Sequence, residues 1–135
     1  LRSGARPGDL VYVAGVLGEA VKLDSLAQRR PTPLVDEGLV AARYASAGMD
    51  VSDGILLDLG RMLAASKVGA EISDVPSETG EDYALLLAVP VKKAAALERA
   101  WKSRAPLRRV GRFTKSRGLK LDGRPVSPRG WDPFR

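Results

Sequence analysis

The stretch that decides the fold is residues 48–59, Gly-Met-Asp-Val-Ser-Asp-Gly-Ile-Leu-Leu-Asp-Leu. A short strand gives way to a helix here, because the apolar positions take helical spacing after Gly54. We expect Asp50, Ser52 and Asp53 at this junction, where the first helical N–H groups lack intrahelical partners and the helix dipole is positive. Carboxylates at such a position suit a magnesium–nucleotide site, since Mg²⁺ takes one or two protein carboxylates and fills its shell with water and phosphate oxygens.

A simpler role is open to the same residues. Asp and Ser are preferred N-cap residues, and Asp53 could accept the backbone N–H of Leu56. A reciprocal capping box is absent, because Ile55 and Leu56 stand three residues after Ser52 and Asp53, where Glu or Gln would be required. The junction is therefore compatible with a cation site or with an ordinary helix cap.

Histidine and cysteine are both missing from the 135 residues. Their absence excludes a disulfide framework, thiolate or histidine zinc sites, a cysteine nucleophile and a Ser-His-Asp triad. A hydrophobic content of 44% and a charged content of 28% are typical of a globular protein, and the length is that of one domain.

The lack of cysteine and of targeting segments fits a cytoplasmic protein, which is our expectation. No apolar run approaches the ~20 residues that a membrane span needs. No signal peptide opens the chain, which begins at Leu1 and reaches an expected strand within its first ten residues. We interpret the chain as part of a longer protein.

Charge is unevenly distributed along the chain. Residues 1–90 carry eight Lys and Arg against thirteen Asp and Glu, a net charge of −5, whereas residues 91–135 carry fourteen against three, a net charge of +11. The basic part could bind phosphates or nucleic acid, or it could simply be a solvated surface.

Strands and helices are expected to interleave. Strands are expected over residues 10–14, a short stretch before Asp50, 70–75, 83–89, 107–114 and 119–121, the last two as a pair. Helices are expected over residues 19–30, 34–45, 54–66 and 91–104, with Gly69 ending the third. That third helix is expected to bury Ile55, Leu56, Leu59, Met62 and Leu63. The pattern predicts an α+β fold, a layered domain with a mixed sheet flanked by helices.

Two further pairs of residues could contact a ligand. Glu81 and Asp82 stand at the start of the strand expected over 83–89, where they could coordinate a cation, contact a polar ligand, or form a charged turn. Trp131 and Phe134 lie in the tail, as a stacking platform or as an anchor on the core. Because the chain has no P-loop, dinucleotide fingerprint or protein-kinase motif, a bound nucleotide would require another architecture.

Taken in order, six segments resemble the C-terminal domain of thiamine-monophosphate kinase. That family belongs to the superfamily of aminoimidazole ribonucleotide synthetase, selenophosphate synthetase and the hydrogenase-maturation dehydratase. The resemblance covers nearly the whole chain. Its segments are Arg6-Pro7-Gly8-Asp9-Leu10-Val11-Tyr12-Val13-Ala14-Gly15 with Leu17-Gly18, Asp50-Val51-Ser52-Asp53-Gly54, Asp58-Leu59-Gly60, Ser66 with Gly69-Ala70-Glu71-Ile72, Gly80-Glu81-Asp82-Tyr83, and Gly130-Trp131 with Phe134.

The resemblance implies an activity and a role for individual residues. The family transfers the γ-phosphoryl group of ATP to thiamine monophosphate, which gives thiamine diphosphate. By match of motif, Asp50 and Asp53 would be Mg²⁺ ligands and Ser52 would contact ATP. Glu81 would contact the thiamine phosphate, and Trp131 would stack on its ring system.

The resemblance also implies a missing partner. We interpret residues 1–135 as a single C-terminal domain, without the N-terminal domain that supplies further magnesium and ATP contacts and the dimer interface. The complete enzyme is expected to be a homodimer, and this chain alone is expected to be inactive. Two alternatives stay open: another ATP-using enzyme of the superfamily, such as a synthetase, or a nucleic-acid-binding module that uses the basic residues 104–135.

Overall fold

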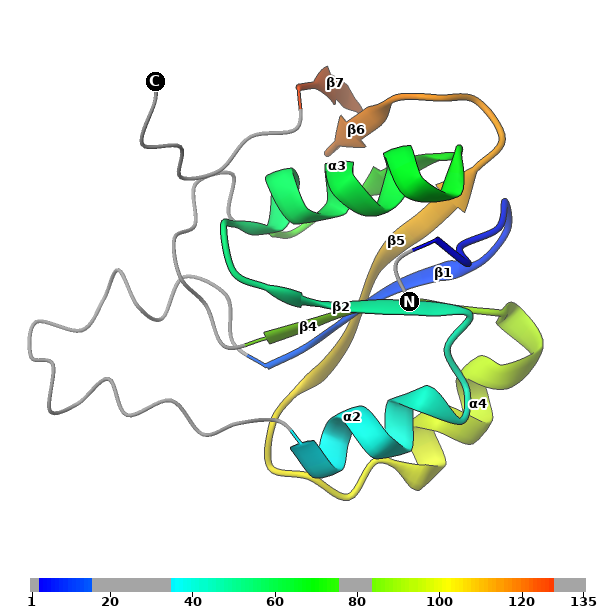
Figure 1. The fold of residues 1–135 in the computed structure, drawn as a ribbon, viewed down its shortest axis with the longest axis vertical. Helices are drawn as coiled ribbons and strands as arrows, with labels where there is room; N and C mark the ends of the chain where they lie inside the picture. The colour runs from blue at the N-terminus through cyan, green and yellow to red at the C-terminus, as the bar shows by residue number, and fades with distance from the viewer. Residues whose placement is uncertain (1–2, 16–34, 76–83, 128–135) are drawn as a thin grey trace, which may run out of the picture.

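The computed structural model describes residues 3–15, 35–75 and 84–127, which form one mixed sheet with helices on both faces (Figure 1). The strands are β1 (Leu10–Ala14), β2 (Ala47–Val51), β3 (Gly69–Ile72), β4 (Ala84–Val89), β5 (Leu107–Thr114), β6 (Leu119–Leu121) and β7 (Arg124–Val126). The helices are α2 (Val35–Ala42), α3 (Ile55–Ser66) and α4 (Val91–Ala100). The predicted α+β class is confirmed.

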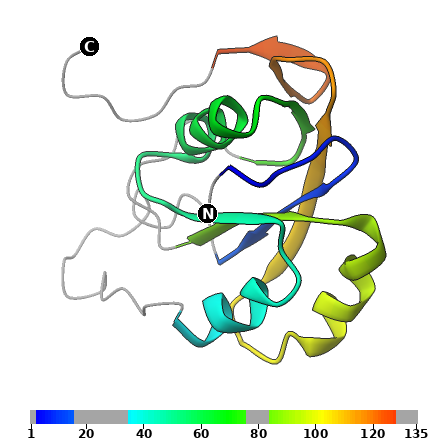
Figure 2. The same ribbon diagram turned by 45° about the vertical axis from the view of Figure 1, so that its right-hand side comes forward.

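The sheet has the strand order β2-β4-β1-β5-β3-β6-β7. Neighbouring strands run antiparallel except β3 and β6, which run parallel. Helix α3 covers one face, and α2 and α4 lie together on the other (Figures 1 and 2). In the part of the chain described here, no helix has the length and apolarity to span a membrane.

The larger hydrophobic core lies between the sheet and α3. The five apolar residues expected on one face of this helix are all buried there: Ile55, Leu56, Leu59, Met62 and Leu63. Alternate residues of the central strands face them from the sheet, as the twofold periodicity of a strand requires. This packing fixes where α3 begins, and with it the position of the turn between β2 and α3.

The second core lies under α2 and α4. Tyr12 of β1 is fully buried in it, and its hydroxyl donates to Glu98 Oε1 of α4 at 2.9 Å. Burial, reinforced by the hydrogen bond to Glu98, raises the pKa of Tyr12 to about 12. Ser103, after α4, donates to Glu37 of α2 at 2.6 Å, so polar contacts hold both helices in place.

The predicted end of α3 near residue 66 is confirmed, but the prediction that Gly69 ends this helix is wrong. Helix α3 ends at Ser66, and Lys67 takes the left-handed conformation at φ 59° as its C-cap. Gly69 is instead the first residue of β3. A Cβ atom there would lie 1.9 Å from the backbone oxygen of Ser116, so glycine is required by a close approach of two chain segments.

Two helices and one strand are shorter than predicted. Helix α2 ends at Ala42 rather than at residue 45, and the 70–75 strand ends at Ile72. Helix α4 ends at Ala100 rather than at residue 104, because Trp101 turns to an extended conformation and its indole N–H donates to Ala105 O at 2.8 Å.

The predicted pairing of the 107–114 and 119–121 strands is also wrong, although both strands have the predicted bounds. Both edges of β5 are occupied, by β1 and by β3, so β6 pairs with the far side of β3 instead. The tail then adds β7 against β6, a strand that the sequence did not indicate. The helix predicted over 19–30 lies outside the described residues.

Candidate functional site

The turn between β2 and α3 is built on Gly54. Its φ of 112° is a conformation that L side chains rarely adopt, and it turns the chain from the strand into the helix. Gly54 is also the N-cap of α3, and no side chain caps the helix there. The simple capping role considered for Asp53 is therefore not observed.

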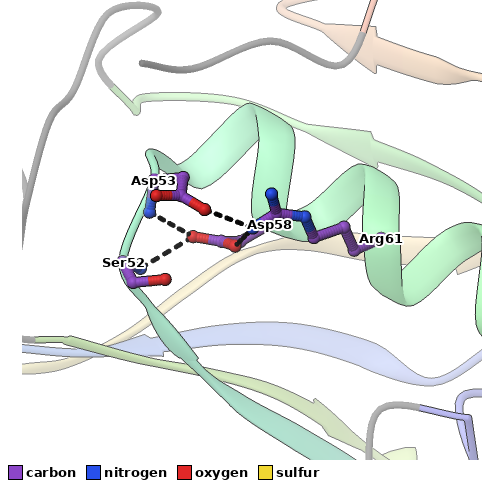
Figure 3. Close-up of polar contacts among 4 residues, drawn as sticks. All are labelled: Ser52, Asp53, Asp58 and Arg61. Carbon is purple, nitrogen blue, oxygen red and sulfur yellow. Dashed lines mark hydrogen bonds and ion pairs between the residues drawn. The ribbon is translucent and has the colours of Figure 1, made fainter. Parts of the chain in front are cut away.

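Asp58 holds this turn together from within the helix (Figure 3). Its carboxylate is fully buried, and Oδ2 accepts the backbone N–H groups of Ser52 at 2.7 Å and of Asp53 at 2.9 Å. A buried carboxylate is tolerated only with such partners. Charge-assisted hydrogen bonds to two successive N–H groups fix the backbone on which Ser52 and Asp53 are carried.

Arg61 completes the cluster. Its Nη1 donates to Asp58 Oδ1 at 2.8 Å and to Asp53 Oδ2 at 2.5 Å, and Figure 3 shows its side chain reaching both. The hydrogen bond to Asp53 raises the pKa of the Arg61 guanidinium, and the contact with Asp58 adds to this. Two carboxylates therefore share one permanent positive charge, which leaves the cluster with one net negative charge.

Asp50 lies apart from this cluster. It stands within β2 opposite Leu85 of β4, whose side chain packs toward α2 and α4. Its neighbour Val51 packs toward α3. Since successive strand residues face opposite sides, the exposed Asp50 is on the sheet face away from α3. The expectation that Asp50 follows the strand is wrong by two positions, and only Ser52 and Asp53 share the turn.

Sequence patterns alone predicted no role for Asp58 or Arg61. Two signals could have found them: a carboxylate beside the apolar positions of an amphipathic helix, and an acid–base pair three residues apart on one helix face. The partners of Asp58, the N–H groups of the preceding turn, depend on how the turn folds, so periodicity does not reveal them.

The carboxylates present are compatible with a magnesium ion that takes few protein ligands. Within residues 3–15, 35–75 and 84–127, no three acidic groups come together as a complete cage. The Asp53 side chain is one-third exposed, so one of its oxygens could ligate an ion whose other ligands are water and phosphate. Glu81 and Trp131, the residues predicted to contact substrate, lie outside the described residues.

Curated relatives match this chain along nearly its whole length. The thiamine-monophosphate kinase of Halobacterium salinarum is 34% identical over 96% of the chain, and that of Aquifex aeolicus is 30% identical over 98%. Each alignment covers 54% of the relative, so the chain spans about half the length of the curated relatives it matches. No protein-family model matches the chain.

Comparison with solved structures points to the same family. The thiamine-monophosphate kinase of Stenotrophomonas maltophilia K279a superposes with a TM-score of 0.79 at 28% identity, over 93% of this chain and 53% of that one. AaThiL complexed with AMPPCP and TMP superposes with a TM-score of 0.76 at 29% identity, over 98% and 53%. Escherichia coli HypE, a hydrogenase maturation protein, shares the fold alone, with a TM-score of 0.77 at 18% identity. By sequence and by fold, the chain belongs to the thiamine-monophosphate kinase family and corresponds to the C-terminal half of its members.

Proposed function

We propose that this chain is the C-terminal half of an enzyme that transfers the γ-phosphoryl group of ATP to thiamine monophosphate, which gives thiamine diphosphate. The observation that carries the proposal is identity of 30% or more to curated kinases over 96–98% of the chain. The similarity to a structure complexed with AMPPCP and TMP supports the same pair of substrates.

The β2–α3 turn is the proposed nucleotide side of the site. Asp50 and Asp53 would hold Mg²⁺, which when bound would neutralise phosphate charge, and Ser52 would contact ATP. Because Asp50 lies on the sheet face away from α3 whereas the Asp53 carboxylate contacts Arg61 of α3, we propose that the two residues ligate different Mg²⁺ ions. Asp58 keeps the backbone of Ser52 and Asp53 in one conformation before substrate arrives.

Glu81 and Trp131 are the proposed substrate side. Glu81 would bind thiamine monophosphate, and the indole of Trp131 would stack on its ring system, since an aromatic face attracts a cationic ring. Phosphoryl transfer depends mainly on positioning and charge neutralisation, so a chain without histidine can contribute fully to such a site.

The remaining part of the enzyme is also a proposal. We propose that an N-terminal half supplies the other magnesium and ATP contacts and the dimer interface, that the complete enzyme is a cytoplasmic homodimer, and that this chain alone does not turn over. Its match to about half of each curated relative supports this division.

An acceptor profile tests the proposal. The chain is combined with the N-terminal half that its relatives carry, and the mixture is supplied with Mg-ATP and either thiamine monophosphate, unphosphorylated thiamine or no acceptor. Each half alone is the control. Thiamine diphosphate formed only by the mixture, and only from thiamine monophosphate, is the expected result. ATP consumption without that product would favour a sister enzyme of the superfamily. A salt-sensitive complex with nucleic acid and no kinase activity would favour the basic binding module.

A further inference from the structure

We propose that Arg61 is a built-in counter-cation of the nucleotide site. Its guanidinium neutralises Asp53 while no divalent ion is bound, and it withdraws to Asp58 alone when Asp53 becomes a metal ligand. The inference rests on the metal role proposed above for Asp53.

The contact geometry provides for this exchange. A single nitrogen, Nη1 of Arg61, contacts Asp53 Oδ2 at 2.5 Å and Asp58 Oδ1 at 2.8 Å. A guanidinium carries five N–H donors in a planar fork, so it can keep one carboxylate after it leaves the other. Asp53 does not need Arg61 to stay in place, because Asp58 holds its backbone N–H at 2.9 Å.

The difference in burial between Asp53 and Asp58 determines which carboxylate Arg61 leaves when a cation binds. The side chain of Asp58 is 0% exposed, whereas those of Asp53 and Arg61 are 33% and 40% exposed. Removing the counter-ion of a buried carboxylate is costly, but an ion pair that faces solvent contributes little. A cation that competes for the cluster will therefore displace Arg61 from Asp53 and leave the Asp58 contact intact.

The exchange has a consequence for ion binding. A free divalent ion must compete with a guanidinium for Asp53, so Arg61 weakens binding of the bare ion. An ion that arrives with nucleotide phosphates brings extra ligands and is less affected. Arg61 thus favours filling of the site by the metal–nucleotide complex over filling by the metal alone.

Mn²⁺ binding to the full chain, followed by electron paramagnetic resonance, tests the inference without nucleotide or a second half. Arg61→Gln is expected to bind Mn²⁺ about two- to fivefold more tightly than the unsubstituted chain. Arg112→Gln is the matched control, because it removes the same charge from an exposed ion pair with Glu71 and should leave the affinity unchanged. Adding Asp53→Asn to Arg61→Gln should abolish the gain.

A second measurement avoids changing Arg61. The side-chain N–H resonance of Arg61 is expected to shift when Mg²⁺ is added to the unsubstituted chain. It is not expected to shift when Mg²⁺ is added to the Asp53→Asn chain. Circular dichroism establishes that each variant is folded.

The inference would be overturned if Arg61→Gln bound Mn²⁺ no more tightly than the unsubstituted chain, or if neither protein bound Mn²⁺. It would also be overturned if the Arg61 resonance did not shift when Mg²⁺ was added to the unsubstituted chain. The proposed function fails separately. A chain that shows the Arg61 effect but yields no thiamine diphosphate with its N-terminal half would refute the kinase proposal and leave this inference standing.

Discussion

The carboxylate of Asp58 accepts the backbone N–H of Ser52 at 2.7 Å, so a fully buried acid in α3 fixes the turn that precedes its own helix. The same oxygen also accepts the N–H of Asp53. The conformation of the turn therefore depends on the helix that follows it, and two hydrogen bonds hold the backbone that carries the exposed Ser52 and the partly exposed Asp53.

Asp58→Asn is expected to destabilise the chain by about 2–4 kcal/mol, because an amide replaces the charged acceptor of two N–H groups and leaves Arg61 without its buried partner. Urea denaturation measures the change. Asp74→Asn, at a carboxylate 94% exposed, is the control and should stay within about 0.5 kcal/mol. Equal stability of the two variants would show that Asp58 does not hold the turn.

Gly69→Ala is expected to lower the free energy of unfolding by about 2 kcal/mol or more, since the new Cβ atom would lie 1.9 Å from the Ser116 backbone oxygen. Gly38→Ala in α2 is the matched control. Nothing lies within 4 Å of its Cβ position, so there the same change should stabilise the chain by about 0.5–1 kcal/mol. Thermal unfolding of both variants gives the comparison, and a Gly69→Ala chain as stable as the parent would refute the close approach.

Alkaline pH is expected to lower the free energy of unfolding of the unsubstituted chain more than that of the Tyr12→Phe chain. The pKa of Tyr12 is raised to about 12 in the fold from 10.0, so the folded state keeps a proton that the unfolded state releases. This stabilisation is complete below pH 10 and is lost as the pH rises to 12, by up to about 2 kcal/mol. Urea midpoints of the two proteins between pH 9 and pH 12 test this, and parallel curves would contradict the raised pKa.

Local patterns in the sequence predicted much of the fold. The bounds of β1, β5 and β6 were predicted correctly, and so was the buried face of α3, because each depends on the spacing of apolar residues within one element. The junction that carries Ser52 and Asp53 was also found, since the change from strand to helix spacing is local.

The errors concern contacts between distant segments. Gly69 looked like a helix end, but its role is set by Ser116 on another part of the chain. The insertion of β3 between β5 and β6 is a choice of pairing partner that neither strand encodes alone. Likewise, Arg61 is an ordinary exposed helix residue until the turn brings Asp53 beside it. Periodicity identifies the elements, and the tertiary arrangement assigns the partners.

The most direct test of the proposed phosphoryl transfer follows the γ-phosphoryl group of labelled ATP into thiamine diphosphate, with the chain combined with the N-terminal half. Asp53→Asn, which keeps the size of the side chain and removes its charge, is predicted to lower turnover by more than about tenfold. Asp74→Asn is the control and should leave turnover unchanged. Label in thiamine diphosphate at the same rate with Asp53→Asn as with the unsubstituted chain would contradict the proposed role of this turn in phosphoryl transfer.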